Sequence, residues 1–424
     1  MRMRVNENGN WRSFRHRNYR ILFPANGLSN IGSWAQRIAQ DWLVLELTNN
    51  NGYYLGLVTA IQFAPFLFFT LHGGLLADRV NKRIALVITN TFGGLSALTL
   101  GILVISGNIQ LWHVFACAAV LGISGAIDGP IRQSFTSEIV GHSDLANAVS
   151  LNSANFNAGR LIGPAISGFL IAHFGTGPSF IINASSYIVV NIALLSMRES
   201  EFFIAESKKT LGTIREGFAY VKARPDLYVV MIAVFFAATF GLNFQIFNAL
   251  MARGEFNKGP ASFGLLGTFI AVGSLSGALL SARLEKQRNT MFVIRMGAVF
   301  SLVVTGLSIM PTYTLYAIWL PICGFTALTM LITANSLMQM HSDPAIRGRI
   351  TGIYMLVFMG GTPFGSLAIG WLVEIIGVRE TVALCGGISL IGMLAIWFYY
   401  KDKVGVPTDI TVEGVLPANY EDPR

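Results

Sequence analysis

The sequence is poor in charge and in cysteine. Of its 424 residues only 12% are charged, about half the fraction that is usual for a soluble domain. The three cysteines, Cys117, Cys323 and Cys385, lie far apart in apolar stretches. This spacing argues against a disulfide framework or a cysteine metal site, so we interpret them as small packing residues.

Motifs for catalysis and for nucleotide binding are also missing. The sequence has no G-x-x-x-x-G-K-[ST] loop, as a primary pump would need, and no H-E-x-x-H pair, and its six histidines are scattered. We therefore expect no metal, no cofactor and no enzymatic activity.

Long apolar runs fill most of the chain. Hydrophobic residues make up 53% of the sequence, and about 20 such residues in a row can cross a bilayer as a helix. The first run follows a basic stretch but is too long for a signal peptide, so we expect it to be retained as a span. The pattern predicts an all-α membrane protein with twelve spans, near residues 19–46, 53–77, 84–106, 109–133, 145–174, 178–198, 227–252, 261–283, 290–311, 313–340, 345–376 and 379–400.

The cations alternate with the spans. If the N-terminus is cytoplasmic, the inner segments contain most of the lysines and arginines, whereas the outer loops contain only Arg253, Lys258 and Arg379. The positive-inside rule then places both termini in the cytoplasm. The net charge of +8 is therefore explained by the lysines and arginines that orient the spans in the membrane. We expect no nucleic-acid partner.

A polar segment divides the spans six and six. We expect a cytoplasmic N-terminal segment (1–18), a six-helix bundle (19–198), a cytoplasmic linker (199–226), a second six-helix bundle (227–400) and a cytoplasmic tail (401–424). In the linker, Leu211, Ile214, Phe218 and Val221 fall at helical spacing, which predicts an amphipathic helix on the membrane surface.

The two halves repeat one glycine pattern. Gly159, Gly163, Gly168 and Gly175 match Gly361, Gly365, Gly370 and Gly377, each 202 positions later. The fifth span therefore corresponds to the eleventh. Parallel repeats of six helices build two bundles around a substrate path in one major class of transporter.

The segment between the second and third spans reads GGLLADRVNKRIAL from Gly73. It resembles the loop signature G-x-L-A-D-R-x-G-R-[RK] of the major facilitator superfamily, with Asn81 in place of a glycine. The matching positions are Gly74, Leu76, Ala77, Asp78, Arg79, Lys82 and Arg83. The resemblance implies a cytoplasmic gating loop that latches the two halves. Arg79 is expected to meet Asp128 of the fourth span, or Arg132 to pair with Asp78.

A second motif lies in the fifth span. Gly159, Gly163, Pro164 and Gly168 resemble the G-x-x-x-G-P-x-x-G-G pattern of antiporters in this superfamily, with Ser167 in place of one glycine. Longer stretches, among them IDGPIRQSFTSEIVGHSDLANAVSLNSANFNAGRLIGPAISG and DPAIRGRITGIYML, are similar to its secretion-effector branch, which includes enterobactin exporters and macrolide efflux proteins. The resemblance implies a monomeric exporter in the bacterial inner membrane.

Charges within the spans are the sharpest clue from the residues themselves. Arg37 and Asp41 lie one turn apart in the first span, and Arg160 lies near the middle of the fifth. A lone charge at that depth costs at least about 2.5 kcal/mol, so each should face a partner or a watery cavity. Asp41 could pair with Arg37 or with Arg160, either as a structural ion pair or as a proton-coupling site, for which Glu46 is a weaker candidate.

Other polar side chains in the spans are candidates for lining a substrate cavity, although such groups also bridge helices. They are Trp34, Gln36, Gln40, Asn155, Asn243, Gln245, Asn335 and Gln339. Together these features predict a secondary transporter in the lipid bilayer that exports a small amphiphilic molecule, such as a macrolide drug or a siderophore, in exchange for protons. The alternatives are a receptor or scaffold that does not transport, and a transporter of another metabolite with a different coupling ion.

Overall fold

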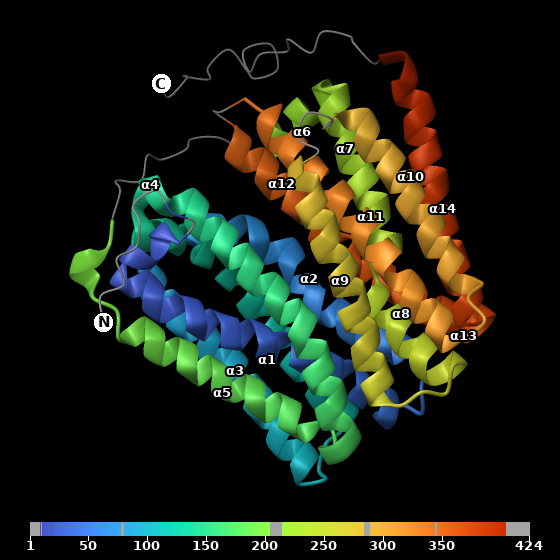
Figure 1. The fold of residues 1–424 in the computed structure, drawn as a ribbon, viewed down its shortest axis with the longest axis horizontal. Helices are drawn as coiled ribbons and strands as arrows, with labels where there is room; N and C mark the ends of the chain where they lie inside the picture. The colour runs from blue at the N-terminus through green and yellow to red at the C-terminus, as the bar shows by residue number, and fades with distance from the viewer. Residues whose placement is uncertain are drawn as a thin grey trace. The chain divides into compact units, whose positions relative to one another are not determined.

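The computed structural model describes residues 9, 11–77, 80–203, 214–283, 289–343 and 346–403. Within these ranges the chain is helical and contains no strand (Figure 1). The α-helices are α1 (Arg17–Leu47), α2 (Gly52–Ala77), α3 (Lys82–Ile105), α4 (Leu111–Phe174), α5 (Gly177–Leu195), α6 (Ile214–Ala223), α7 (Pro225–Phe236), α8 (Phe244–Leu250), α9 (Pro260–Arg283), α10 (Thr290–Ser308), α11 (Tyr313–Met340), α12 (Arg347–Gly360), α13 (Thr362–Ile376) and α14 (Val378–Tyr400).

The predicted spans are helical in the described part of the chain, where ten segments are long and apolar enough to cross a membrane. The α4 segment contains two of the predicted spans, α7 with α8 forms one, and α12 with α13 forms another. The α1 helix is not among the ten segments, because polar residues interrupt its apolar sequence. The all-α membrane class is therefore confirmed.

One turn differs from the expectation. Residues 134–140, expected to form part of a connection between two spans, continue α4, and the helical backbone is interrupted at Gly141, with φ 70° and ψ 171°. An L side chain rarely adopts this left-handed φ, so glycine suits the position. The change of direction therefore occupies a single residue.

The chain forms two compact units. Unit 1 contains Met1–Asn50, Ala64–Ser207 and Lys258–Thr268, and unit 2 contains Asn51–Phe63, Lys208–Asn257 and Phe269–Arg424. Two of the boundaries fall inside α2 and α9, so each of these helices contributes residues to both units.

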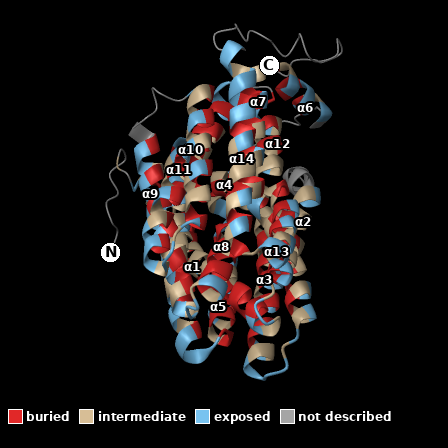
Figure 2. Cartoon of the chain, turned by 90° about the vertical axis from the view of Figure 1, so that its right-hand side faces the viewer, coloured by how far each residue is buried: buried red, intermediate tan, exposed pale blue. Residues whose placement is uncertain are grey.

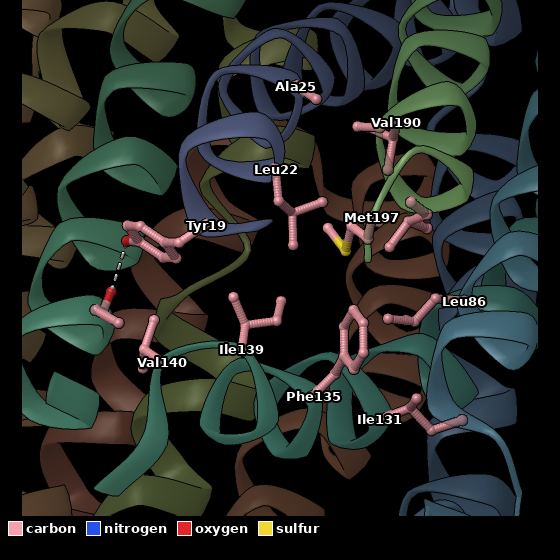
Figure 3. Packing of buried hydrophobic residues seen from close by; sticks show 13 residues of the cluster. Tyr19, Leu22, Ala25, Leu86, Ile131, Phe135, Ile139, Val140, Val190 and Met197 are labelled. Atoms are coloured by element: carbon pink, nitrogen blue, oxygen red, sulfur yellow. Dashed lines mark hydrogen bonds between the residues drawn. The ribbon is translucent and has the colours of Figure 1, made fainter. Parts of the chain in front are cut away.

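A hydrophobic cluster joins α1, α3, α4 and α5 within unit 1 (Figure 3). The Tyr19 hydroxyl is held at the edge of this cluster, because it donates to the backbone oxygen of Ala148 at 3.2 Å and lies 3.1 Å from Oδ1 of Asn152. The cluster includes Ala25 and Ile131, whose neighbours in sequence are Asn26 and Arg132. Packing of the apolar residues thus fixes the places of the polar ones beside them.

Many large apolar side chains remain exposed on the helices. Exposed residues follow the length of α5 and α14 (Figure 2), where Ile188 is 59% and Ile391 68% accessible. Soluble monomers rarely expose continuous apolar surface of this kind. The pattern fits helices whose outward faces contact lipid.

Asp144 of α4 anchors the N-terminal 3-10 helix Arg12–Arg15. Its carboxylate lies 3.4 Å from Nε of Arg12, 2.7 Å from Nε of Arg15 and 2.8 Å from Nε2 of His16, and its side chain is only 3% exposed. Three basic groups thus converge on one buried acid.

The predicted amphipathic helix is α6, and it packs on α12 in unit 2. Glu216 forms an ion pair with Arg349 at 3.0 Å, and Gly217 lies against Ile353. Phe218 is 46% exposed, whereas Leu211 lies outside the described residues.

Candidate functional site

Unit 1 contains a cavity of about 300 Å³ between α1, α3, α4 and α5. Its wall is unusually polar for the interior of apolar helices. The lining residues are Asn26, Ser29, Asn30, Ser33, Thr89, Asn90, Leu121, Ser124, Gly125, Asp128, Arg132, Asn152, Asn155, Phe156 and Tyr187.

An ion pair within α4 supplies the charge of this cavity. Nε of Arg132 lies 2.6 Å from Oδ1 of Asp128, and Nη2 lies 2.8 Å from Oδ2, so the guanidinium binds both carboxylate oxygens. Thr89 of α3 donates to Asp128 at 3.0 Å, and Arg132 donates to Oδ1 of Asn26 of α1 at 2.9 Å. The pair is thus held by two other helices, and its side chains are 28% (Arg132) and 20% (Asp128) exposed.

The structure describes only some of the loop residues that are expected to act as a gate. Asp78 and Arg79 lie outside the described residues, and of Gly74 only its place in α2 is described. Asp128 and Arg132, each proposed as a partner for that loop, bind one another.

The remaining loop cations bind acids of unit 1. Lys82 lies 2.6 Å from Oε1 of Glu138 in α4, and Arg83 lies 2.8 Å from Oε1 of Glu199. Arg83 also donates to the backbone oxygens of Leu194 and Leu195, at 2.8 and 2.7 Å. These contacts fasten the start of α3 to α4 and to the end of α5.

A second charged cluster lies around Trp34, which we call the Trp34 cluster: Trp34, Arg37, Asp41, Phe156 and Arg160. The guanidinium carbon of Arg37 lies 5.1 Å from the centre of the indole ring, and that of Arg160 lies 5.7 Å from it. Both distances are in the range of cation–π attraction. Phe156 packs its ring edge-on against Trp34 at 5.8 Å and also lines the cavity, so the cluster and the cavity share this side chain.

The acid of the Trp34 cluster is buried. Asp41 is 5% exposed, and its charge acts on Arg37, one helical turn away. The structure places Arg37 and Arg160 at the same indole ring, with Asp41 one helical turn from Arg37. Glu46 is exposed at the end of α1, where it accepts from Nε1 of Trp42 at 2.7 Å.

Gln36 and Gln40 are both buried in α1. Oε1 of Gln36 accepts from Nδ2 of Asn183 in α5 at 2.6 Å, which joins the two helices. Asn155 lines the cavity and donates to the backbone oxygen of Phe23 at 2.9 Å.

The predicted cavity residues of the second half belong to unit 2 and do not line the cavity of unit 1. Asn243 is buried and donates to the backbone oxygen of Thr239 at 2.8 Å, and Gln245 is half-buried two residues later. Nε2 of Gln339 donates to Oδ1 of Asn335 at 3.1 Å within α11.

The glycine motif explains why Trp34 lies so close to α4. A methyl group at Gly163 would lie 2.7 Å from the carbonyl oxygen of Ile31 and 2.7 Å from Cβ of Trp34, and one at Gly159 would lie 2.7 Å from Cβ of Asn30. The backbones of α1 and α4 can approach only because these positions lack side chains. This approach places Arg160 beside the indole.

Further along α4, Pro164 and Gly168 pack against the first turns of α9, within unit 1. A methyl group at Gly168 would lie 2.9 Å from the carbonyl oxygen of Pro260 and 3.1 Å from Cα of Gly264. The side chain of Pro164 lies beside Gly267.

The repeated glycines of unit 2 make contacts in the same order. Gly361 and Gly365 pack on Thr239 of the π-helical turn Ala237–Gly241, just as Gly159 and Gly163 pack on α1. Gly370 packs on Gly52 and Gly56 of α2, as Gly168 packs on α9. The sequence repeat is therefore also a repeat of helix contacts.

Several cavity residues were not expected from the sequence. Asn26, Asn30 and Ser33 follow one another at helical spacing along α1, and Trp34, Arg37 and Asp41 continue the series. Polar residues at intervals of three or four in an otherwise apolar helix share one face. That periodicity could have identified the α1 residues that line the cavity. Nothing in the sequence indicates that Asn90 or Tyr187 also line it.

The described residues offer no cluster of three His, Cys, Asp or Glu side chains that could hold a metal ion. The arrangement suits reversible binding: a polar cavity, a neutralised ion pair and two cations on an aromatic surface.

Apolar helices around a polar, charged cavity are typical of an integral membrane protein, and solved structures share this fold. A bacterial homologue of the human lysosomal transporter Spinster superposes with a TM-score of 0.72 at 15% identity, over 91% of this chain and 98% of that one. A D-xylose–proton symporter superposes with a TM-score of 0.68 at 14% identity, over 89% and 97%.

The chain belongs to the transmembrane secretion effector family, which it matches over residues 8–409. Its relatives include the staphyloferrin A transporter of Staphylococcus aureus, 22% identical over 93% of this chain and 99% of that protein. The multidrug efflux pump Tap of Mycolicibacterium fortuitum is 25% identical over 89% and 94%, and the enterobactin exporter EntS of Shigella flexneri is 22% identical over 89% and 91%. The protein is thus a multi-pass membrane transporter of small molecules and not an enzyme.

Proposed function

We propose that the protein exports a small amphiphilic organic molecule in exchange for protons, by alternating access between two six-helix bundles (19–198 and 227–400). The observation that carries this proposal is the polar cavity among the apolar helices of unit 1, which shares Phe156 with the charged Trp34 cluster. Charged groups at such depth are costly and persist where they bind cargo or ions. The names of the relatives favour a drug or a siderophore as the class of cargo.

The proposed setting is the cytoplasmic membrane of a bacterium, with the protein acting as a monomer and both termini in the cytoplasm. The distribution of lysine and arginine supports this orientation. Lys82, Arg83 and Arg349, which form ion pairs with neighbouring acids, would then all lie on the cytoplasmic side.

Asp41 is the residue that we propose to couple transport to protons. Its carboxylate is buried and acts on Arg37, and Arg37 in turn acts on a second guanidinium, that of Arg160. Burial favours the neutral acid and a nearby arginine favours the anion, so a small shift of either arginine could change the protonation of Asp41.

Replacing Asp41 with asparagine is expected to abolish energised export while folded protein stays in the membrane. Asparagine keeps the size of the side chain but cannot lose a proton. The measurement compares bacteria that lack their own drug and siderophore exporters and carry either the wild type or Asp41→Asn. Growth in the presence of macrolides and release of siderophores into the medium are recorded at matched protein levels.

Glu46→Gln serves as the comparison, since Glu46 lies on the same helix but is exposed. Loss of export in Glu46→Gln with normal export in Asp41→Asn would transfer the coupling role to Glu46. If the wild type changes neither drug resistance nor siderophore release, the export function itself is refuted and a receptor role is favoured.

A further inference from the structure

A carboxylate fastens the start of α2 to α13. The backbone N–H of Gly52, the first residue of α2, donates to Oε1 of Glu374 at 2.6 Å. The first N–H groups of a helix have no acceptor within that helix, and the positive end of its dipole favours a negative charge. Glu374 supplies both the acceptor and the charge, from a position 322 residues further along the chain.

Beside this hydrogen bond, α2 and α13 meet backbone to backbone within unit 2. A methyl group at Gly56 would meet the backbone oxygen of Ser366 and would lie 3.1 Å from Cα of Gly370. Gly52 and Gly56 are buried, whereas Glu374, one turn beyond Gly370, is exposed. The α2–α13 contact thus consists of closely packed glycines with one ionisable side chain at its end.

The corresponding contact of the other repeat has no carboxylate. Gly168 of α4 corresponds to Gly370, and it packs on the first turns of α9 within unit 1. At the position that matches Glu374, 202 residues earlier, α4 has Ala172. Both contacts form through glycines, so close packing does not require the acid. The acid in one repeat alone therefore indicates a task other than packing.

The helices of the α2–α13 contact come from different halves of the sequence. In the proposed arrangement, α2 belongs to the bundle 19–198 and α13 to the bundle 227–400, and Gly52 and Glu374 both lie at the outer ends of their spans. Alternating access requires the two bundles to separate on the outer side before cargo can leave. A hydrogen bond between α2 and α13 opposes that separation.

We propose that Glu374 is a positioning residue of outward opening. Its carboxylate holds the first turn of α2 on α13 while the outer side is closed, and it releases the N–H of Gly52 when that side opens. A charge-assisted hydrogen bond is about twice as strong as a neutral one, yet water can solvate an exposed carboxylate as the bond breaks, so the fastening is reversible. This role rests on the proposed export by alternating access, for which it names a residue that sets the balance between closed and open states.

The rate at which a buried cysteine reacts measures how often the outer side opens, without requiring transport. Ser366 of the α2–α13 contact is 0% exposed, so Ser366→Cys is the reporter, treated with a water-soluble maleimide in lipid nanodiscs. The three native cysteines are buried and give the background. Ser389→Cys reports general loosening instead, because Ser389 is also 0% exposed but bonds to Ser301 of α10.

Adding Glu374→Ala should speed the labelling of Ser366→Cys by about threefold to tenfold, since the closed state loses a charge-assisted hydrogen bond. The labelling of Ser389→Cys should not change. Glu374→Gln should give an intermediate rate, because the amide oxygen accepts the same hydrogen bond without the charge. The matched control is Glu380→Ala, which removes an exposed acid from the first turn of α14 and should label like the wild type.

The proposal is overturned if Glu374→Ala leaves the labelling of Ser366→Cys unchanged. It is equally overturned if the labelling of Ser389→Cys rises by the same factor, because Glu374 would then stabilise the fold as a whole. Export of macrolides and siderophores is recorded for the same proteins. Export with unchanged labelling would refute the role of Glu374 and leave the export function standing, whereas faster labelling at Ser366→Cys alone, without export of any compound, would do the reverse.

Discussion

Replacing Arg132 with methionine should lower the free energy of unfolding by about 1–3 kcal/mol, because the half-buried Asp128 carboxylate loses the partner of both its oxygens. Methionine fills much of the same volume but leaves the Asp128 carboxylate in the cavity with Thr89 as its remaining donor among the hydrogen bonds of the described residues. The oxygens of Asn26 and Asn90 also lose the guanidinium. Unfolding of the protein in nanodiscs by heat or by a denaturing detergent measures the loss.

The double variant Asp128→Leu/Arg132→Met separates this effect from a loss of packing. Removing both charges leaves no uncompensated carboxylate, so most of the lost stability should return. If the double variant is as unstable as Arg132→Met alone, the ion pair is not the source of the effect. Equal stability of Arg132→Met and the wild type would contradict the predicted destabilisation.

Replacing Gly163 with alanine should destabilise the protein by about 1–3 kcal/mol, the usual cost of overpacking a filled interface. The new methyl group would meet the backbone oxygen of Ile31 and the backbone nitrogen of Ala35, at 2.7 and 3.1 Å, and backbone atoms cannot rotate away. Because Cβ of Trp34 is also 2.7 Å away, the indole should move as well.

Gly129→Ala is the matched control, since it makes the same change in the same helix where a methyl group would meet no atom within 4 Å. Alanine favours the helix over glycine by up to about 1 kcal/mol, so this variant should be as stable as the wild type or slightly more stable. Equal melting temperatures for Gly163→Ala and Gly129→Ala would show that α1 and α4 are not closely packed at Gly163.

The positions of most helices could be predicted from the sequence, because the bilayer imposes a length and an apolar composition on each span. The predicted ends of the first and second spans, near 46 and 77, fall within a residue of Leu47 and Ala77. The glycine repeat was equally informative, since Gly163 and Gly365 both lie where two backbones meet. Small residues at fixed spacing in an apolar helix are typical of close helix contacts, so the pattern alone indicates where backbones approach.

The pairing of charges could not be derived from the sequence. Asp128 and Arg132 are four residues apart on one helix and face each other, but the loop cation Arg79 was an equally reasonable partner for Asp128. Whether Asp128 pairs with Arg132 or with Arg79 depends on the packing of α1 and α3 on α4. This packing brings Asn26 to Arg132 and Thr89 to Asp128. Likewise, the meeting of Arg37 and Arg160 at Trp34 depends on how closely α1 approaches α4.

Blocking the cavity of unit 1 tests most directly whether cargo passes through it. Ser124 lines the cavity, whereas Ser185 of α5 is exposed and bonds to its own helix. Each is replaced by cysteine and treated with a bulky maleimide, and the treated wild type serves as a background because its three cysteines are buried. Uptake of a macrolide or a siderophore that the wild type exports is then measured in inside-out vesicles with an imposed pH gradient. Labelled Ser124→Cys should lose most of its uptake and labelled Ser185→Cys should keep it, and full uptake by labelled Ser124→Cys would contradict a cargo path through this cavity.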